Sequence, residues 1–139
     1  MTSPSGPRLT LVVEPVLLSV LRLEPGSPAP DWFRAARTPG FRAELATADE
    51  RTLVLPSADV SGSFDGLHED GFRGLRVAAV LDFALVGILA GLASVLAEVG
   101  VSILAFSTFD TDWLLVREAD LEVAVGALER AGYPVESVP

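Results

Sequence analysis

The chain has 139 residues, a length that suggests one compact unit or two small fused halves. Half of its residues are hydrophobic, which excludes disorder of the whole chain. The formal net charge of −9 argues against a nucleic-acid partner, which needs clustered Lys and Arg, and the absence of cysteine excludes disulfides and thiol chemistry.

Residues 1–8 are polar and rich in proline and glycine, and we expect this N-terminal segment to be disordered. It lacks the basic and then apolar order of a signal peptide. The most hydrophobic window, Phe83–Ala97, is uncharged but has only 15 residues, whereas a membrane span needs about 20. We therefore predict a cytoplasmic protein with a buried helix in this window and no membrane partner.

Residues 9–71 are expected to form a first half with the order β-α-β-β. Proline and glycine force a loop at Glu24–Pro30 and leave room for one short helix, which Asp31 caps. Pro56–Gly71 carries four turn-forming residues and four acids, and we interpret it as the junction between the halves. The expected strands and helix are Leu9–Val13, Val16–Leu23, Trp32–Arg37, Phe41–Ala46 and Thr52–Leu55.

Residues 72–139 show a clearer pattern. Six large apolar residues recur at helical spacing in Ala84–Val99, and a second apolar face follows in Glu118–Ala131. Gly100 is placed to end the first of these helices. The expected strands are Phe72–Val80, Val101–Phe106, Trp113–Val116 and Tyr133–Val138. The order β-α-β-β-α-β predicts an α+β ferredoxin-like fold, an antiparallel sheet with both helices on one face.

A polar segment, Ser107–Asp112, separates two apolar strands and carries three hydroxyls, two carboxylates and one ring. Such a composition between buried strands is typical of a small recognition site. Asp110 or Asp112 could accept hydrogen bonds from a cationic group. Thr108 and Thr111 could donate to a carboxylate, and Phe109 could cover an aliphatic portion. The alternative is a plain hairpin whose Asp and Thr side chains cap their own backbone.

Three segments, Leu81–Gly87, Val101–Val116 and Leu115–Leu121, resemble the ACT domain, and the chain looks like the small tandem-ACT proteins of bacteria. The resemblance implies a non-enzymatic regulatory protein that binds a free amino acid between half-domains or between subunits. The implied partners are a second copy of the chain, as a homodimer, or a regulated metabolic enzyme. The first half resembles a shortened ACT copy in layout alone, with its second helix reduced or lost.

The resemblance also implies a role for the segment that enters the first helix of the second half. Free amides at a helix N-terminus attract a carboxylate, and Gly87 would let a ligand approach closely. Asp82, Phe83, Ala84 and Gly87 are therefore candidate ligand-binding residues. Similar proteins carry hydroxyls where this chain has Ala84 and Val86, which leaves backbone rather than side-chain hydrogen bonds. The alternative is that Asp82 simply caps the helix and Gly87 is a packing residue.

Two other functions remain as alternatives. A ligand-free structural or oligomerisation module would fit the loss of hydroxyls at Ala84 and Val86, because ferredoxin-like sheets readily join edge to edge. A small enzyme could use Asp110 and Asp112 as acid and base. With one histidine, His68, and no cysteine, a nucleophile–base triad has no support. We expect no catalytic residues, no metal and no cofactor.

Overall fold

A computed structural model describes residues 9–138 apart from 36–37, 62–63, 65 and 83. The expected disorder of residues 1–8, and the candidate residue Phe83, lie outside the described residues. The chain divides into two compact units. The larger unit combines the N-terminal residues up to Pro15 with residues 75–139, and the smaller unit is Val16–Gly74. Each unit is described by itself.

The sheet of the larger unit has the order β6-β7-β5-β1-β8. It is mixed, because β1 pairs antiparallel with β5 and parallel with β8. The sequence placed Leu9–Val13 with the first half, whereas β1 lies between the first and last strands of the second. The strands are β1 Leu11–Val13, the end of β5 Leu67–Val77, β6 Ile103–Ser107, β7 Asp112–Arg117 and β8 Val135–Ser137.

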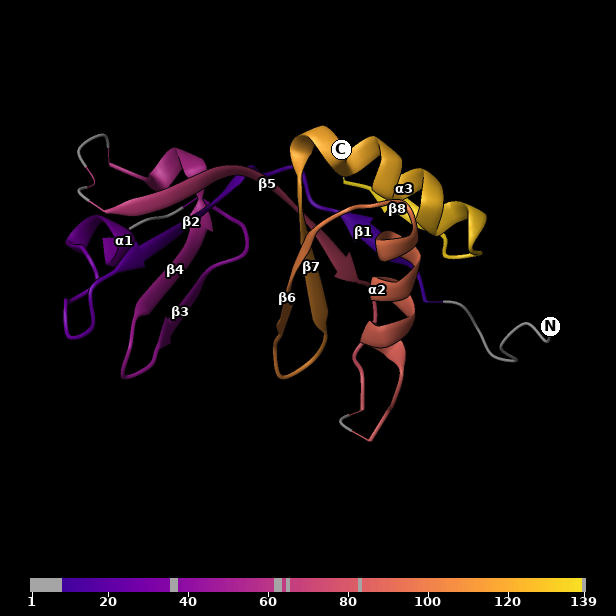
Figure 1. Ribbon diagram of the computed structural model, residues 1–139, viewed down its shortest axis with the longest axis horizontal. Helices are drawn as coiled ribbons and strands as arrows, with labels where there is room; N and C mark the ends of the chain where they lie inside the picture. The colour runs from indigo at the N-terminus through magenta and orange to yellow at the C-terminus, as the bar shows by residue number, and fades with distance from the viewer. Residues whose placement is uncertain (1–8, 36–37, 62–63, 65, 83, 139) are drawn as a thin grey trace. The chain divides into compact units, whose positions relative to one another are not determined.

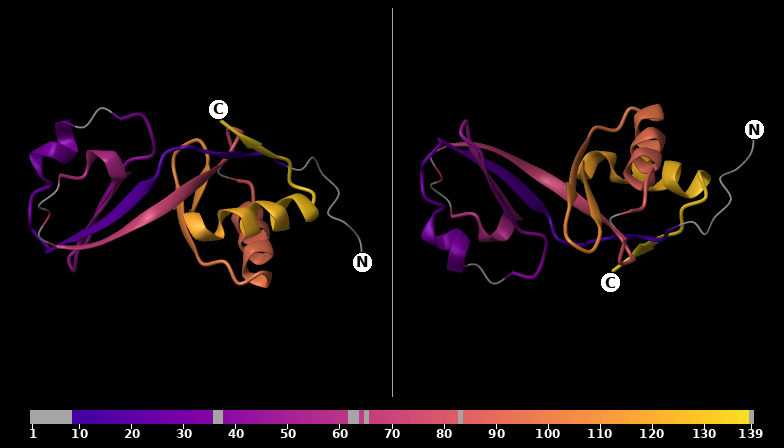
Figure 2. Two further views of the ribbon diagram at one scale, coloured as in Figure 1. Left: turned by 90° about the horizontal axis from the view of Figure 1, so that it is seen from above. Right: turned by 90° about the horizontal axis from the view of Figure 1, so that it is seen from below.

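Two helices cover one face of this sheet, α2 (Ile88–Glu98) and α3 (Leu121–Arg130), the latter preceded by the 3-10 turn η2 (Glu118–Asp120). Both lie on the same side of β1 (Figures 1 and 2). Alternate strand residues and the helix stripes share one buried cluster, so the predicted α+β ferredoxin-like arrangement is confirmed. The buried cluster comprises Leu11, Val13, Leu75, Val77, Leu92, Leu96, Val101, Leu114, Val116, Ala124 and Leu128.

The helix ends show where local sequence decides the structure. After α2, Val101 N–H donates to Leu96 O at 3.0 Å and Gly100 N–H donates to Ala97 O at 3.0 Å, a Schellman motif at the predicted C-cap. The start differs from the prediction, because α2 begins at Ile88 and not at Ala84. Gly87, with φ +83°, interrupts the helical path one residue earlier.

The described residues of the smaller unit form an antiparallel sheet in the order β3-β4-β2-β5, with one short helix. A single 3-10 turn, η1, follows β4 where the larger unit has α3. Leu67–Gly71, interpreted as part of the junction, belongs to β5, which begins at Leu67 rather than Phe72. The elements are β2 Leu18–Leu23, α1 Asp31–Ala35, β3 Ala43–Ala46, β4 Arg51–Pro56 and η1 Ser57–Asp59.

Candidate functional site

A cavity of about 250 Å³ lies in the larger unit, between the loop after β5, the first turn of α2 and the β6–β7 turn. It brings together the two segments from which the sequence predicted a site. The described residues of those predicted segments all line it except Ala84 and Val86. The lining residues are Leu81, Asp82, Leu85, Gly87, Ile88, Leu89, Ala90, Ser107, Thr108, Phe109, Asp110, Thr111 and Asp112.

Hydrogen bonds hold the loop after β5 against the β6–β7 turn. Leu81 N–H donates to Asp110 O at 2.6 Å, and the Thr111 hydroxyl donates to Val77 O at 2.8 Å. Asp82 then closes a local turn, because its carboxylate accepts from Ala84 N–H at 2.7 Å and its carbonyl accepts from Leu85 N–H at 3.0 Å. The predicted alternative of Asp82 as the helix cap is therefore wrong, since it caps the turn before the helix.

The first turn of α2 faces the cavity without a side-chain cap. Gly87 is the N-cap residue and supplies no side chain, and its carbonyl accepts the first intrahelical bond, from Gly91 N–H at 2.9 Å. The amides of Ile88, Leu89 and Ala90 come before that bond and have no acceptor within the helix. All three residues line the cavity. A group of backbone donors with the positive end of the helix dipole therefore borders it.

The β6–β7 turn satisfies most of its own polar side chains. The Ser107 hydroxyl donates to Asp112 Oδ1 at 2.7 Å. Thr108 Oγ1 accepts from Thr111 N–H at 3.2 Å, and Thr108 N–H donates to Thr111 O at 2.8 Å. These four residues do the capping that the alternative interpretation predicted.

Asp110 differs from the other polar residues of the turn. Its carbonyl oxygen bonds Leu81, but its carboxylate accepts no hydrogen bond from the residues that the structure describes. Asp110 lines the cavity on the side of the turn, and Ile88, Leu89 and Ala90 line it on the side of α2. A negative side chain and a cluster of positive backbone dipoles thus border one small space, which is the arrangement that a zwitterion requires.

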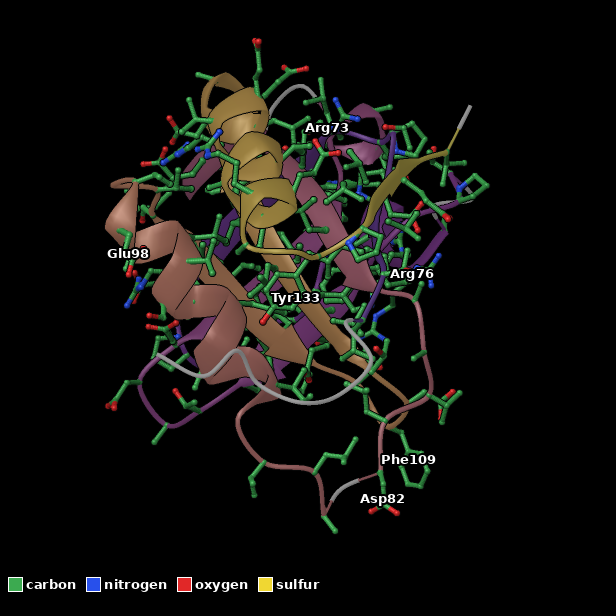
Figure 3. All side chains as sticks on the ribbon, turned by 90° about the vertical axis from the view of Figure 1, so that its right-hand side faces the viewer. Arg73, Arg76, Asp82, Glu98, Phe109 and Tyr133 are labelled. Atoms are coloured by element: carbon green, nitrogen blue, oxygen red, sulfur yellow. The ribbon has the colours of Figure 1, made fainter. Side chains whose placement is uncertain are left out.

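Exposed apolar side chains flank the cavity. Phe109 is 80% exposed, and its ring lies near Asp82 at the tip of the loop (Figure 3). Leu85 is 53% exposed. The sequence did not predict Leu81, Leu85, Ile88, Leu89 or Ala90 as site residues; Leu85, Ile88 and Leu89 were assigned to the apolar stripe of a helix. The sequence signal that could have found the start of the helix is Gly87, because the helix begins only after it, at Ile88.

The described part of the chain lacks two features, a metal-binding cluster and a membrane-spanning helix. No group of three or more His, Asp or Glu side chains is placed to hold a metal ion among the described residues. Among the same residues, no helix is long and apolar enough to cross a membrane.

Comparison with known proteins shows what the region around this cavity is similar to. Residues 67–130 match the family model described as the ACT domain. A search of the curated proteins finds no match to the sequence. Among solved structures, a protein of Agrobacterium tumefaciens is 28% identical, with a TM-score of 0.84 over 96% of both chains.

Two further structures share the fold at lower identity. The ligand-free regulatory subunit of aspartate kinase from Thermus thermophilus is 10% identical, with a TM-score of 0.61 over 89% of this chain and 94% of that one. The allosteric aspartate kinase of Clostridium acetobutylicum is 14% identical, with a TM-score of 0.63 over 84% of this chain and 33% of the kinase.

Proposed function

Since residues 67–130 match the family model of the ACT domain, we propose that the chain is a non-enzymatic regulatory protein that binds a free amino acid in the cavity beside α2. The observation that carries this proposal is the pairing of uncapped amides at Ile88–Ala90 with the carboxylate of Asp110 around one cavity. The cavity volume of about 250 Å³ suits a ligand of amino-acid size.

Each part of an amino acid has a counterpart around the cavity. The α-carboxylate would accept hydrogen bonds from the first-turn amides of α2, where the helix dipole favours negative charge. The ammonium group, or a guanidinium, would donate to Asp110 in a charge-assisted contact. Phe109 and Leu85 would cover the aliphatic portion. Ala84 and Val86 carry no hydroxyl, so recognition of the carboxylate would rest on the backbone.

A panel of the twenty amino acids tests this function by thermal unfolding. At 100 times its Kd, the preferred amino acid should raise the free energy of unfolding by about 2.7 kcal/mol. Its carboxamide, which lacks the carboxylate, and its des-amino analogue, which lacks the ammonium group, should each stabilise less. A panel in which no amino acid shifts the melting temperature would contradict the proposal.

Gly87→Ala tests the contribution of the helix amides. Alanine at φ +83° is strained, so we expect the free energy of unfolding to fall by about 1–2 kcal/mol. Relief of this strain should displace the first turn of α2 and weaken ligand binding about tenfold, or about 1.4 kcal/mol. Calorimetric titration with the preferred amino acid measures the binding.

Gly26→Ala is the matched control for Gly87→Ala. Gly26 has φ +80° with no atom within 4 Å of an added Cβ, so alanine meets the same backbone strain there. It does not line the cavity. We expect a similar loss of stability with unchanged affinity. If Gly87→Ala binds the amino acid as tightly as Gly26→Ala does, the helix amides do not hold the ligand.

The second candidate function is a structural module that joins copies of the chain. In the described part of the larger unit β6 pairs with β7 alone, and Ile103–Ser107 carries none of the charged or proline residues that usually protect an edge strand. Light scattering at micromolar concentration distinguishes the candidates when it is read beside the amino-acid panel. A stable dimer whose melting temperature no amino acid of the panel changes supports the structural module.

A further inference from the structure

The cavity beside α2 has an apolar side, which bears on the side chain that a bound amino acid can carry. Three of its apolar lining residues, Leu81, Ile88 and Leu89, also pack against the buried cluster of the larger unit, so the core fixes their positions. The residues that give the cavity this apolar side are Leu81, Leu85, Ile88, Leu89, Ala90 and Phe109.

The hydroxyl groups that line the cavity have used their protons inside the protein. The Ser107 hydroxyl donates to Asp112 Oδ1 at 2.7 Å, and the Thr108 hydroxyl donates to Thr111 O at 3.2 Å. The Thr111 hydroxyl donates to Val77 O at 2.8 Å. Because a hydroxyl has one proton, none of the three can donate to a polar side chain of a ligand without breaking an internal bond.

The charged side chains of the described lining are all carboxylates, and no arginine, lysine or histidine is among them. A second carboxylate on the ligand would therefore be repelled without a cationic side chain to offset it. Asp82 accepts from Ala84 N–H at 2.7 Å, and Asp112 accepts from Ser107. A second cation on the ligand would thus meet carboxylates that already hold internal bonds, once its ammonium group has taken Asp110.

A hydrocarbon side chain meets none of these costs. A polar group that leaves water for this cavity loses its hydration and finds no free hydroxyl donor in return. Leu85 is 53% exposed and Phe109 is 80% exposed in the free protein. A hydrocarbon group placed against them removes apolar surface of both molecules from water, and each methylene group so buried strengthens binding about fourfold.

We propose that the amino acid bound beside α2 has a hydrocarbon side chain. The inference rests on the proposed function, because it takes the carboxylate of the ligand to the first-turn amides of α2 and the ammonium group to Asp110. The remaining substituent of the ligand then lies on the apolar side of the cavity, against Leu81, Leu85 and Leu89.

A homologous series of amino acids tests the inference. Calorimetric titration with L-alanine, L-2-aminobutyrate and L-norvaline varies the length of the hydrocarbon and keeps both charged groups of the ligand. The affinity should rise about fourfold with each added methylene group. Affinities that stay level or fall along the series would overturn the inference.

Pairs of ligands with similar size separate hydrocarbon from polar side chains. Leucine should bind at least about tenfold more tightly than asparagine or aspartate, and norleucine at least about tenfold more tightly than lysine. Lysine, arginine or an acidic amino acid as the tightest ligand would overturn the inference and leave the proposed function standing. If no amino acid binds, both are overturned.

Leu85→Ala locates the hydrocarbon side chain of the ligand. Leu85 is exposed and lies outside the buried cluster, so the variant should fold, and circular dichroism verifies this. Its affinity for L-norvaline should fall about fourfold or more, and its affinity for L-alanine should fall less. The ratio of the two affinities is the readout, because a general disturbance of the cavity lowers both alike.

Val86→Ala is the matched control, and Leu85→Glu is a second variant. Val86 is 89% exposed, follows Leu85 and does not line the cavity, so its truncation should keep the ratio of the parent. Leu85→Glu places a carboxylate on the apolar side and should raise the affinity for lysine relative to norleucine about tenfold. An unchanged ratio in either Leu85 variant, or an equal change in Val86→Ala, would overturn the inference.

Discussion

Replacing Leu128 by alanine is expected to lower the free energy of unfolding of the larger unit by about 2.7–5 kcal/mol. Leu128 is fully buried and belongs to the cluster that α2, α3 and three strands share. Its removal leaves a cavity that the interlocking neighbours fill only in part. Urea denaturation followed by the fluorescence of Trp113, which lies in β7, measures the loss.

Val123→Ala is the matched control for Leu128→Ala on the same helix. Val123 is 49% exposed and lies outside the buried cluster. Alanine is the better helix former, so the change in stability should stay within about 0.5 kcal/mol. Similar losses in the two variants would mean that α3 does not pack on the sheet by the face that contains Leu128.

Changing Asp110 to asparagine is expected to weaken binding of the preferred amino acid about 10- to 150-fold, or about 1.5–3 kcal/mol. Asparagine keeps the size of the side chain but removes the charge that would hold an ammonium or guanidinium group. The free protein should lose little stability, because the carboxylate of Asp110 bonds no other described residue. Calorimetric titration measures the affinity, and thermal unfolding without ligand measures the stability.

Asp112→Asn is the companion variant, and the two together separate recognition from capping. The Asp112 carboxylate accepts from Ser107 inside the turn, so asparagine there should keep most of the affinity. If both variants bind as the parent does, the carboxylates act within the turn and recognition rests on the backbone at the start of α2. If Asp112→Asn alone loses affinity, the assignment of the cationic group to Asp110 is wrong.

Periodicity predicted the larger unit well, because a helix stripe such as that of Leu92 and Leu96 can be buried only against an apolar sheet face. It could not predict the place of β1. A strand of three apolar residues carries too little pattern to indicate its partner strands. The partners of Leu11–Val13 are decided by tertiary contacts. The start of β5 was missed because residues 67–70 are exposed and, after Leu67, polar, so they lack the alternating pattern of a half-buried strand.

The segments that form the candidate site could be predicted from the sequence, but the roles of their individual side chains could not. Ser107–Asp112 stood out because polar residues rarely interrupt two apolar strands without a reason. In the structure that segment and Leu81–Gly87 border one cavity. Which carboxylate faces the cavity without an internal partner depends on the geometry of the turn, since Asp110 and Asp112 are equivalent by composition.

The place of β1 between β5 and β8 has a consequence for folding during synthesis. Residues 11–13 precede one of their partner strands, Val135–Ser137, by more than a hundred residues. Every pairing within the smaller unit joins residues between 18 and 72. Its short-range contacts can form while the chain is still growing, whereas the larger unit must close a loop of more than a hundred residues. Strand β1 can pair with β5 before β8 has been made, but the sheet of the larger unit is complete only when β8 joins it. The higher contact order of the larger unit therefore makes its completion the later step.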